Sequence, residues 1–207
     1  MPAFPVYLFD VDGTLMDSAS DICGAIQHVL ALRGRTDVEE ALLRRYIGRH
    51  LFDLFLDLGF SNGDMEPMLA DYREHYYASA HSGTRVYPGV ADALSKLGGR
   101  KSTATTKSTP GTRGILERFG LLQYFDHVQG TDGFPAKPEP NVILKSLEVF
   151  EVNPEECLLV GDAPSDMEAG RRAGVKICAV RYGYGDPGEL AKWEPDYWIN
   201  DPRDLVG

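Results

Sequence analysis

Carboxylates, hydroxyls and lysines stand directly after short apolar runs at several places in this sequence. The segments that carry them are DVDGT at 10–14, TTK at 105–107, KP at 137–138 and GDAPSD at 161–166. Ligands of open α/β sheets gather at the carboxyl ends of the strands, so we expect these segments to meet at one rim. Four carboxylates crowded at one rim repel one another, and a divalent cation usually relieves that repulsion.

The donor atoms of this rim favour a hard cation, and Mg²⁺ is the expected metal because it prefers oxygen ligands. Asp10 and Asp162 are expected to bind it directly, and Asp166, one helical turn after Asp162, to hold a metal-bound water. A substrate phosphate commonly completes a Mg²⁺ shell. Lys137 would pair with both that phosphate and Asp10, and backbone N–H groups opened by Gly13 would cradle the phosphate oxygens.

Short apolar or β-branched runs alternate with helix-period segments along most of the chain. The predicted strands are Val6–Phe9, Lys101–Thr106, Phe125–Gly130, Cys157–Val160, Lys176–Val180 and Tyr197–Ile199. The predicted helices between them are Pro88–Leu97, Pro110–Phe119, Asn141–Phe150 and Ser165–Ala173. This alternation predicts an α/β fold, with a Rossmann-like parallel sheet core and helices on both faces.

Residues 17–85 differ from the rest of the chain because they hold helix-period patterns and no convincing strand. Ile22, Ile26 and Leu30 lie on one helix face, and a second apolar stripe runs from Met65 to Tyr76. We expect residues 1–16 and 86–207 to form the α/β core, and residues 17–85 to form an inserted all-helical cap domain.

Composition narrows the range of partners. The chain has 207 residues, with 21 Lys plus Arg and 31 Asp plus Glu, and its formal net charge is −10. So acidic a chain is repelled by nucleic acids and anionic membranes, and we expect neither as a partner. We expect a cytoplasmic protein for three reasons. The three cysteines are widely spaced, no apolar run approaches the ~20 residues that span a bilayer, and the first residues do not resemble a signal peptide.

The segments DVDGT, TTK, KPEP and GDAPSD resemble, in order, the four motifs of the haloacid dehalogenase superfamily. The ending GVKICAVRYGYGDPGEL resembles its phosphoglycolate phosphatase-like branch, and the helical insert stands where that superfamily places a small helical cap. The resemblance implies that Asp10 is a nucleophile that attacks phosphorus and forms an aspartyl-phosphate. It also implies that Asp12 protonates the leaving alcohol and then activates water, and that the Asp12 backbone carbonyl binds the metal.

Four further residues receive roles from the same resemblance. Thr105 would bind the transferring phosphoryl group, and Lys137 would neutralise its charge. Asp162 and Asp166 would hold Mg²⁺. The second motif is unusually rich in hydroxyl groups, so Thr106 competes with Thr105 for the phosphoryl-binding position.

Two residues bear on the type of reaction. Dehalogenases of this superfamily lack the second acid of the first motif, so Asp12 favours phosphoryl transfer. Thr14 stands where β-phosphoglucomutase-like members carry a branched apolar residue, which favours hydrolysis. We therefore expect a Mg²⁺-dependent phosphatase that acts on a small phosphorylated metabolite. A phosphomutase of the same fold and a non-catalytic Mg²⁺- or phosphate-binding regulator remain as alternatives.

Substrate contacts are expected from both parts of the chain. In the core they come from Gly13, Thr14, Thr106 and Lys107, although Lys107 suits a plain surface position equally well. In the insert, Arg44, Arg45, Arg49 and His50 surround Gly48. Arg49 and His50 are the best placed of these to bind a substrate carboxylate or second phosphate. His75, Tyr76 and Tyr77 are interpreted as packing and surface residues, and the protein as a monomer or homodimer.

Overall fold

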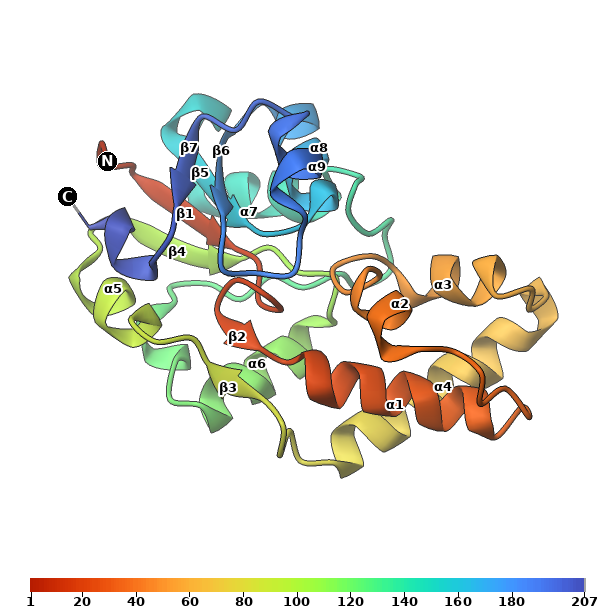
Figure 1. Ribbon diagram of the computed structural model, residues 1–207. Helices are drawn as coiled ribbons and strands as arrows, with labels where there is room; N and C mark the ends of the chain where they lie inside the picture. Colours follow the sequence, from red (N-terminus) through yellow and green to blue (C-terminus); the bar gives the residue numbers. More distant parts are fainter. Residues whose placement is uncertain (207) are drawn as a thin grey trace.

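A five-stranded parallel sheet lies at the centre of the computed structural model, which describes residues 1–206 (Figure 1). In spatial order its strands are β4 Arg100–Thr103, β1 Val6–Phe9, β5 Cys157–Gly161, β6 Lys176–Val180 and β7 Tyr197–Ile199. Every neighbouring pair is parallel. Strands β1 and β5 are buried along their whole length, which explains why both appear in the sequence as continuous apolar runs.

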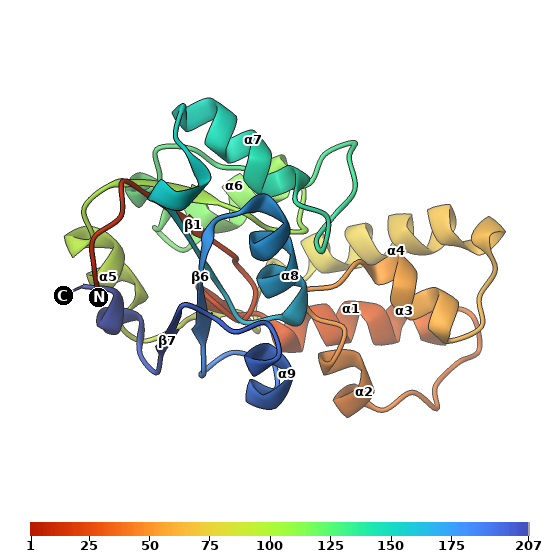
Figure 2. The same ribbon diagram turned by 90° about the horizontal axis from the view of Figure 1, so that it is seen from above.

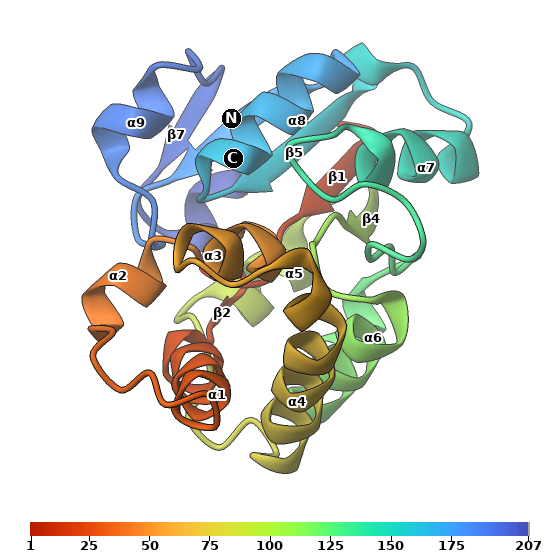
Figure 3. The ribbon, with the colours of Figure 1, turned by 90° about the vertical axis from the view of Figure 1, so that its right-hand side faces the viewer.

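Helices cover both faces of this sheet (Figure 3). They are α5 Val90–Lys96, α6 Thr109–Arg118, α7 Asn141–Phe150, α8 Pro164–Ala173 and α9 Pro187–Ala191, with short 3₁₀ turns at Leu122–Tyr124, Pro154–Glu156 and Pro202–Leu205. Tyr7 and Phe9 of β1 pack in one cluster with α5 and α6. Val6 and Leu8 pack in the opposite cluster with α7, α8 and α9. The predicted α/β fold class is confirmed.

Residues 17–85 form a helical insert beyond the carboxyl ends of β1 and β4 (Figures 1 and 2). Its helices are α1 Ala19–Ala31, α2 Glu40–Arg44, α3 Leu51–Asp57 and α4 Met65–Ala78, with a 3₁₀ turn at Asn62–Asp64. They share a hydrophobic cluster of their own, in which Ile26, Phe55 and Met68 are fully enclosed. The helix-period stripes of the sequence are therefore the packing faces of the insert.

A two-stranded antiparallel ribbon joins the insert to the core. Its strands are β2 Met16–Asp17 and β3 Arg85–Val86, and Met16 pairs with Val86. Just inside the ribbon, the buried Asp21 side chain accepts hydrogen bonds from the Thr84 hydroxyl, at 2.6 Å, and from the Gly83 N–H, at 3.0 Å. The sequence did not predict these strands, because two residues are too few for a period-2 pattern to show.

Two predicted strands differ from the structure. The strand predicted at Phe125–Gly130 is wrong, since this segment runs beside β4 without forming a ladder. The Asp126 and His127 N–H groups both donate to the Lys101 carbonyl, and side chains make further contacts: the Thr103 hydroxyl exchanges hydrogen bonds with the Gln129 backbone, and the Asp126 carboxylate accepts the Lys101 N–H. The strand predicted over Lys101–Thr106 ends earlier, at Thr103, because the backbone then turns towards the rim.

The remaining helices and strands lie close to the positions predicted from the sequence. The other predicted helices and strands end within two residues of their expected bounds, whereas α9 was not predicted. Cys23, Cys157 and Cys178 are buried free thiols, as expected. Within residues 1–206, no helix combines the length and the apolar character that crossing a membrane requires.

Candidate active site

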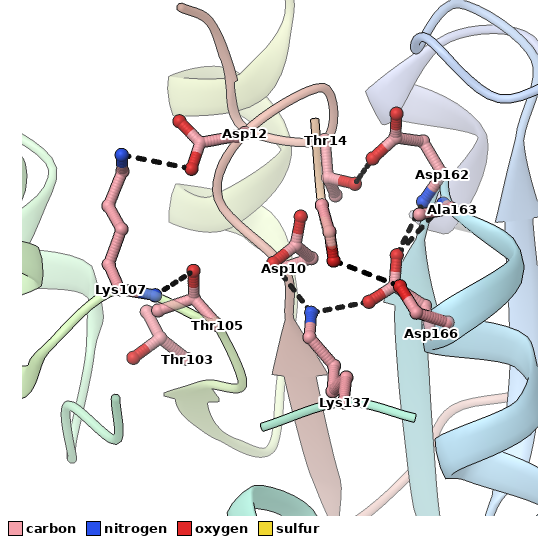
Figure 4. A network of polar contacts seen from close by, with 12 residues as sticks. Asp10, Asp12, Thr14, Thr103, Thr105, Lys107, Lys137, Asp162, Ala163 and Asp166 are labelled. Carbon is pink, nitrogen blue, oxygen red and sulfur yellow. Dashed lines mark hydrogen bonds and ion pairs between the residues drawn. The ribbon is translucent and has the colours of Figure 1, made fainter. Parts of the chain in front are cut away.

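The four motif segments meet at the carboxyl ends of the central strands. Asp10 follows β1, Thr105 follows β4 and Asp162 follows β5, while Lys137 enters from the loop that precedes α7. Figure 4 shows Lys137 between Asp10 and Asp166, and a second pair, Asp12 and Lys107, on the other side of Asp10. The rim predicted from the sequence is therefore one continuous polar network, and nearly all of it is buried.

Lys137 is the buried cation of this network. Its Nζ donates to Asp10 Oδ1 at 2.8 Å and also to Asp166 Oδ1, and no part of its side chain is exposed. Burial alone would lower the pKa of Lys137, but the two carboxylates outweigh it and hold that pKa above its usual value. Lys137 is therefore an ammonium ion whose charge faces the Asp10 carboxylate.

Both carboxylate oxygens of Asp166 hold neighbouring groups of the network in place. Its Oδ2 accepts the N–H groups of Asp162, at 3.1 Å, and Ala163, at 2.9 Å, while Oδ1 pairs with Lys137. A Cβ atom at Gly161 would lie 2.5 Å from the Asp166 carboxyl, so a larger residue there would displace it. Asp166 thus fixes both the loop after β5 and the lysine, as an acid in the first turn of α8.

Asp162 is held from two sides. The Thr14 hydroxyl donates to its Oδ1 at 3.2 Å, and the Tyr184 N–H donates to its Oδ2 at 2.7 Å. Burial raises the pKa of Asp162 well above its usual value, and the nearby Asp10 and Asp166 add to the rise. Thr14, expected to contact substrate, instead directs its hydroxyl to this carboxylate.

Gly13 allows the first loop to approach Asp162. It has a φ of +88°, and a Cβ atom there would lie 2.2 Å from Asp162 Oδ2. Only glycine accommodates both the backbone conformation and the contact.

The acidic residues of the network fit a bound cation. Asp10, Asp162 and Asp166 offer carboxylate oxygens that all lie within 4.8 Å of one another. Asp10 Oδ2 is buried and has no hydrogen-bond partner among residues 1–206. Burial, opposed by Lys137 and reinforced by Asp166 and Asp12, raises the pKa of Asp10 to about 7. Buried carboxylate oxygens this close together are a donor set that suits Mg²⁺.

Asp12 is held between the core and the insert. Its Oδ1 accepts the hydroxyl of Ser18, the residue before α1, and its Oδ2 lies 3.1 Å from the Lys107 ammonium. Ser18 was not identified from the sequence, where its only signal is that of a helix N-cap. Lys107 is only 14% exposed in its side chain, so the alternative of a plain surface charge is wrong.

The hydroxyl groups after β4 divide into different roles. The Thr103 hydroxyl is hydrogen-bonded to the N–H and the carbonyl of Gln129, as described above. Thr105 is fully buried beside the carboxylates, and its hydroxyl accepts the Lys107 N–H at 3.3 Å. Thr106 lines the cavity between core and insert. Of Thr105 and Thr106, Thr105 lies among the residues of Figure 4, and Thr106 lines the cavity.

A cavity of about 230 Å³ lies between the insert and the core. Asp12, Thr106 and Lys107 line it from the core, and opposite them are side chains of the insert that include Arg49, His50, Tyr46, Tyr72, Tyr76 and Tyr77. Arg44 and Arg45 do not line it, and Arg44 pairs with Glu40 on the surface at 2.8 Å. Tyr76 was interpreted as a packing residue, but it is both packed and in contact with Lys107.

Tyr184 was also missed in the sequence. Besides its N–H contact to Asp162, its hydroxyl donates to Asp17 at 2.8 Å and accepts the N–H groups of Ser18 and Ala19. One residue thus connects a carboxylate of the network to the first turn of α1. The contacts of the Tyr184 hydroxyl join segments more than 160 residues apart, and no local sequence pattern predicts them.

Known proteins resemble this chain along most of its length. The family model for haloacid dehalogenase-like hydrolases matches residues 7–180. A phosphoglycolate phosphatase of Aquifex aeolicus is 35% identical over 205 residues, which cover 97% of this chain and 94% of that protein. An N-acetylmuramic acid 6-phosphate phosphatase of Pseudomonas aeruginosa is 30% identical, with coverages of 96% and 92%.

Solved structures agree with these matches. The crystal structure of a predicted phosphatase from Clostridium acetobutylicum superposes with a TM-score of 0.92 at 27% identity, covering 99% of this chain and 97% of the other. The resemblance drawn from DVDGT, TTK, KPEP and GDAPSD is confirmed. The chain belongs to the haloacid dehalogenase-like hydrolase family.

Proposed function

We propose that this protein is a Mg²⁺-dependent phosphatase that hydrolyses a small phosphomonoester through an aspartyl-phosphate on Asp10. One observation carries the proposal: among residues 1–206, Asp10 Oδ2 is buried without a hydrogen-bond partner, while Asp10 Oδ1 is held by the Lys137 ammonium. The lysine orients the carboxylate and leaves one oxygen free. A fixed carboxylate with one free oxygen is arranged as a nucleophile.

The reaction has two steps. In the first, Asp10 Oδ2 attacks phosphorus and the ester P–O bond breaks, while the Asp12 carboxyl gives its proton to the leaving alkoxide. In the second, water attacks the aspartyl-phosphate, Asp12 takes a proton from that water, and the P–O bond to Asp10 breaks to release phosphate. Thr105 would bind the transferring phosphoryl group, and Lys137 would offset its charge.

The cation would be held by Asp10, Asp162 and the backbone carbonyl of Asp12, with Asp166 behind them. Support comes from the clustering of the three carboxylates and from their burial. When bound, Mg²⁺ supplies Lewis-acid polarisation of the phosphoryl oxygens. Thr14 and Asp166 keep the carboxylate of Asp162 and its loop in place.

The substrate would lie in the 230 Å³ cavity, with the insert, residues 17–85, as a cap that closes over it. Gly13 and Thr106 would contact the phosphate end, and Lys107, beside Asp12, would contact the substrate at its leaving oxygen. Arg49, whose guanidinium lies 4.7 Å from the Tyr46 ring centre, would bind an anionic group at the far end, with His50 beside it. The relatives named phosphoglycolate phosphatase favour a small carboxylated ester. The proposal includes a cytoplasmic location and a monomer or homodimer.

The test compares Asp10→Asn with the wild type, using p-nitrophenyl phosphate and phosphoglycolate in the presence of Mg²⁺. We expect Asp10→Asn to abolish turnover of both esters, and the matched control Glu155→Gln, an exposed carboxylate just before β5, to retain it. Turnover by Asp10→Asn would exclude Asp10 as the nucleophile. Isomerisation of a sugar phosphate without phosphate release would indicate a mutase. Mg²⁺ binding without activity on a broad ester panel would indicate a regulator.

A further inference from the structure

A tyrosine of the insert contacts the lysine that holds the acid–base carboxylate of the core. We propose that Tyr76 is a positioning residue that acts through Lys107 to place the Asp12 carboxyl for proton transfer. The acid–base group is then complete only when the insert is seated on the core. This inference rests on the proposed phosphatase function.

Tyr76 is fixed in place by its neighbours on the insert. It lies on α4, is only 4% exposed, and stacks against Tyr72 with ring centres 5.5 Å apart. His81 packs edge-on against the same ring at 4.8 Å. A ring held on two sides keeps its hydroxyl in one position, which an exposed tyrosine would not.

The hydroxyl and the ring of Tyr76 both contact Lys107. The Lys107 ammonium donates to Tyr76 Oη at 2.9 Å and lies 4.4 Å from the ring centre. Lys107 follows β4 in the core, so this contact crosses from core to insert. An ammonium held by a hydrogen bond and by an aromatic face loses the freedom that a lysine side chain usually has.

The same ammonium lies 3.1 Å from Asp12 Oδ2, and the Ser18 hydroxyl donates to Asp12 Oδ1. Both oxygens of Asp12 are therefore held by groups that depend on the position of the insert, since Ser18 leads into α1 and Lys107 is held from α4. Without the Tyr76 hydroxyl, Lys107 keeps its ion pair with Asp12 but loses its hydrogen bond to the insert, and it can follow other rotamers into the cavity that it lines.

The chemical consequence concerns the leaving group. When the ester bond breaks, a proton passes from the Asp12 carboxyl to the leaving alkoxide oxygen, and Asp12 becomes a carboxylate beside the Lys107 ammonium. An alkoxide needs that proton, whereas p-nitrophenolate leaves as a stable anion and depends on it far less. A misplaced Asp12 therefore slows the first step, formation of the aspartyl-phosphate, for alkyl esters and spares that step for p-nitrophenyl phosphate. The second step, hydrolysis of the aspartyl-phosphate, is the same for both esters.

The experiment measures kcat and KM of Tyr76→Phe for an alkyl phosphate, phosphoglycolate, and for p-nitrophenyl phosphate. Phenylalanine keeps the packed ring and removes only the hydroxyl. For the alkyl ester we expect kcat/KM, which reports the steps up to release of the leaving alcohol, to fall about 10-fold, the size that one hydrogen bond to a charged group supports. We expect KM for that ester and kcat/KM for p-nitrophenyl phosphate to change less than about twofold. Tyr124→Phe, distant from the cavity, is the matched control and should behave as the wild type.

A double-mutant cycle tests whether Tyr76 acts through Lys107. In a Lys107→Met background, Tyr76→Phe should cause no further loss of kcat/KM. Three results would each overturn the inference: equal losses on both esters, a rise in KM alone, or losses that multiply in the double variant. A wild type that cleaves neither ester would refute the proposed function itself, whereas an active wild type with an unaffected Tyr76→Phe would refute this inference alone.

Discussion

When a chelator has removed divalent cations, we expect the free energy of unfolding of this protein to fall as the pH rises from 5 to 8. The buried carboxyl of Asp10 has a folded-state pKa raised to about 7, and the pKa of Asp162 is raised as well. A carboxyl whose pKa is raised by folding binds its proton more tightly in the folded state. Its favourable contribution is present below the unfolded pKa and is lost as the pH rises through the folded pKa.

The size of the effect follows from the shift at Asp10. Taking its pKa from 3.8 in the unfolded chain to about 7 in the folded one, linkage gives a loss of about 2.5 kcal/mol between pH 5 and pH 8. Asp162 adds to the loss with the same sign. The proposed Mg²⁺ would bind the ionised carboxylates, so saturating Mg²⁺ should remove most of the loss at pH 8.

Urea unfolding at pH 5 and pH 8, in chelator and in Mg²⁺, measures these free energies directly. Asp10→Asn keeps the shape of the side chain and removes its titration, so its loss in chelator should be smaller by about 2.5 kcal/mol. Glu155→Gln, an exposed carboxylate, should keep the wild-type loss. Parallel pH dependence in the wild type and Asp10→Asn would show that burial does not raise the pKa of Asp10.

Three further substitutions test single contacts of the site. Lys137→Met should abolish turnover and lower the free energy of unfolding by ~3–5 kcal/mol, because it leaves two carboxylates buried without their cation; a urea midpoint near that of the wild type would contradict this. Arg49→Met should raise KM for phosphoglycolate about 10-fold or more and leave KM for p-nitrophenyl phosphate unchanged; equal shifts would remove Arg49 from carboxylate binding. Gly13→Ala should weaken Mg²⁺ binding in calorimetry, because its Cβ would displace the Asp162 carboxyl; unchanged affinity would argue against Asp162 as a ligand.

The part of the site that the sequence predicted is the part that local rules describe. Asp10 and Asp162 come directly after buried apolar strands, and the carboxyl end of a parallel strand is where a polar side chain reaches the rim. The prediction of a strand at Phe125–Gly130 is wrong, as described above. Hydrogen bonds from Thr103 and to Asp126 occupy the groups that a ladder would have used, and such bonds depend on tertiary contacts.

The part that could not be predicted consists of contacts between distant segments. Tyr184 reaches Asp162 and the start of α1, and Tyr76 reaches Lys107 from the other side of the cavity. In the sequence neither stands out: Tyr184 lies in a glycine-rich segment, GYGDPG, and Tyr76 is one of several aromatic residues in DYREHYYA. Their roles follow from how the insert sits on the core, and a periodic pattern along one helix carries no information about that placement.

The antiparallel ribbon of β2 and β3 bears on whether the insert can be removed or replaced without disturbing the core. The insert leaves and re-enters the core at paired residues, Met16 and Val86, whose Cα atoms are about 5 Å apart in such a ladder. A tight turn at this point would close the core chain without the helices. The wall that the insert contributes to the cavity can therefore be exchanged as a module, because Asp10, Lys137 and Asp162 all lie outside the insert. Such an exchange would leave this cluster in place but would replace Ser18 and Tyr76, whose contacts to Asp12 and Lys107 a new insert would have to supply again.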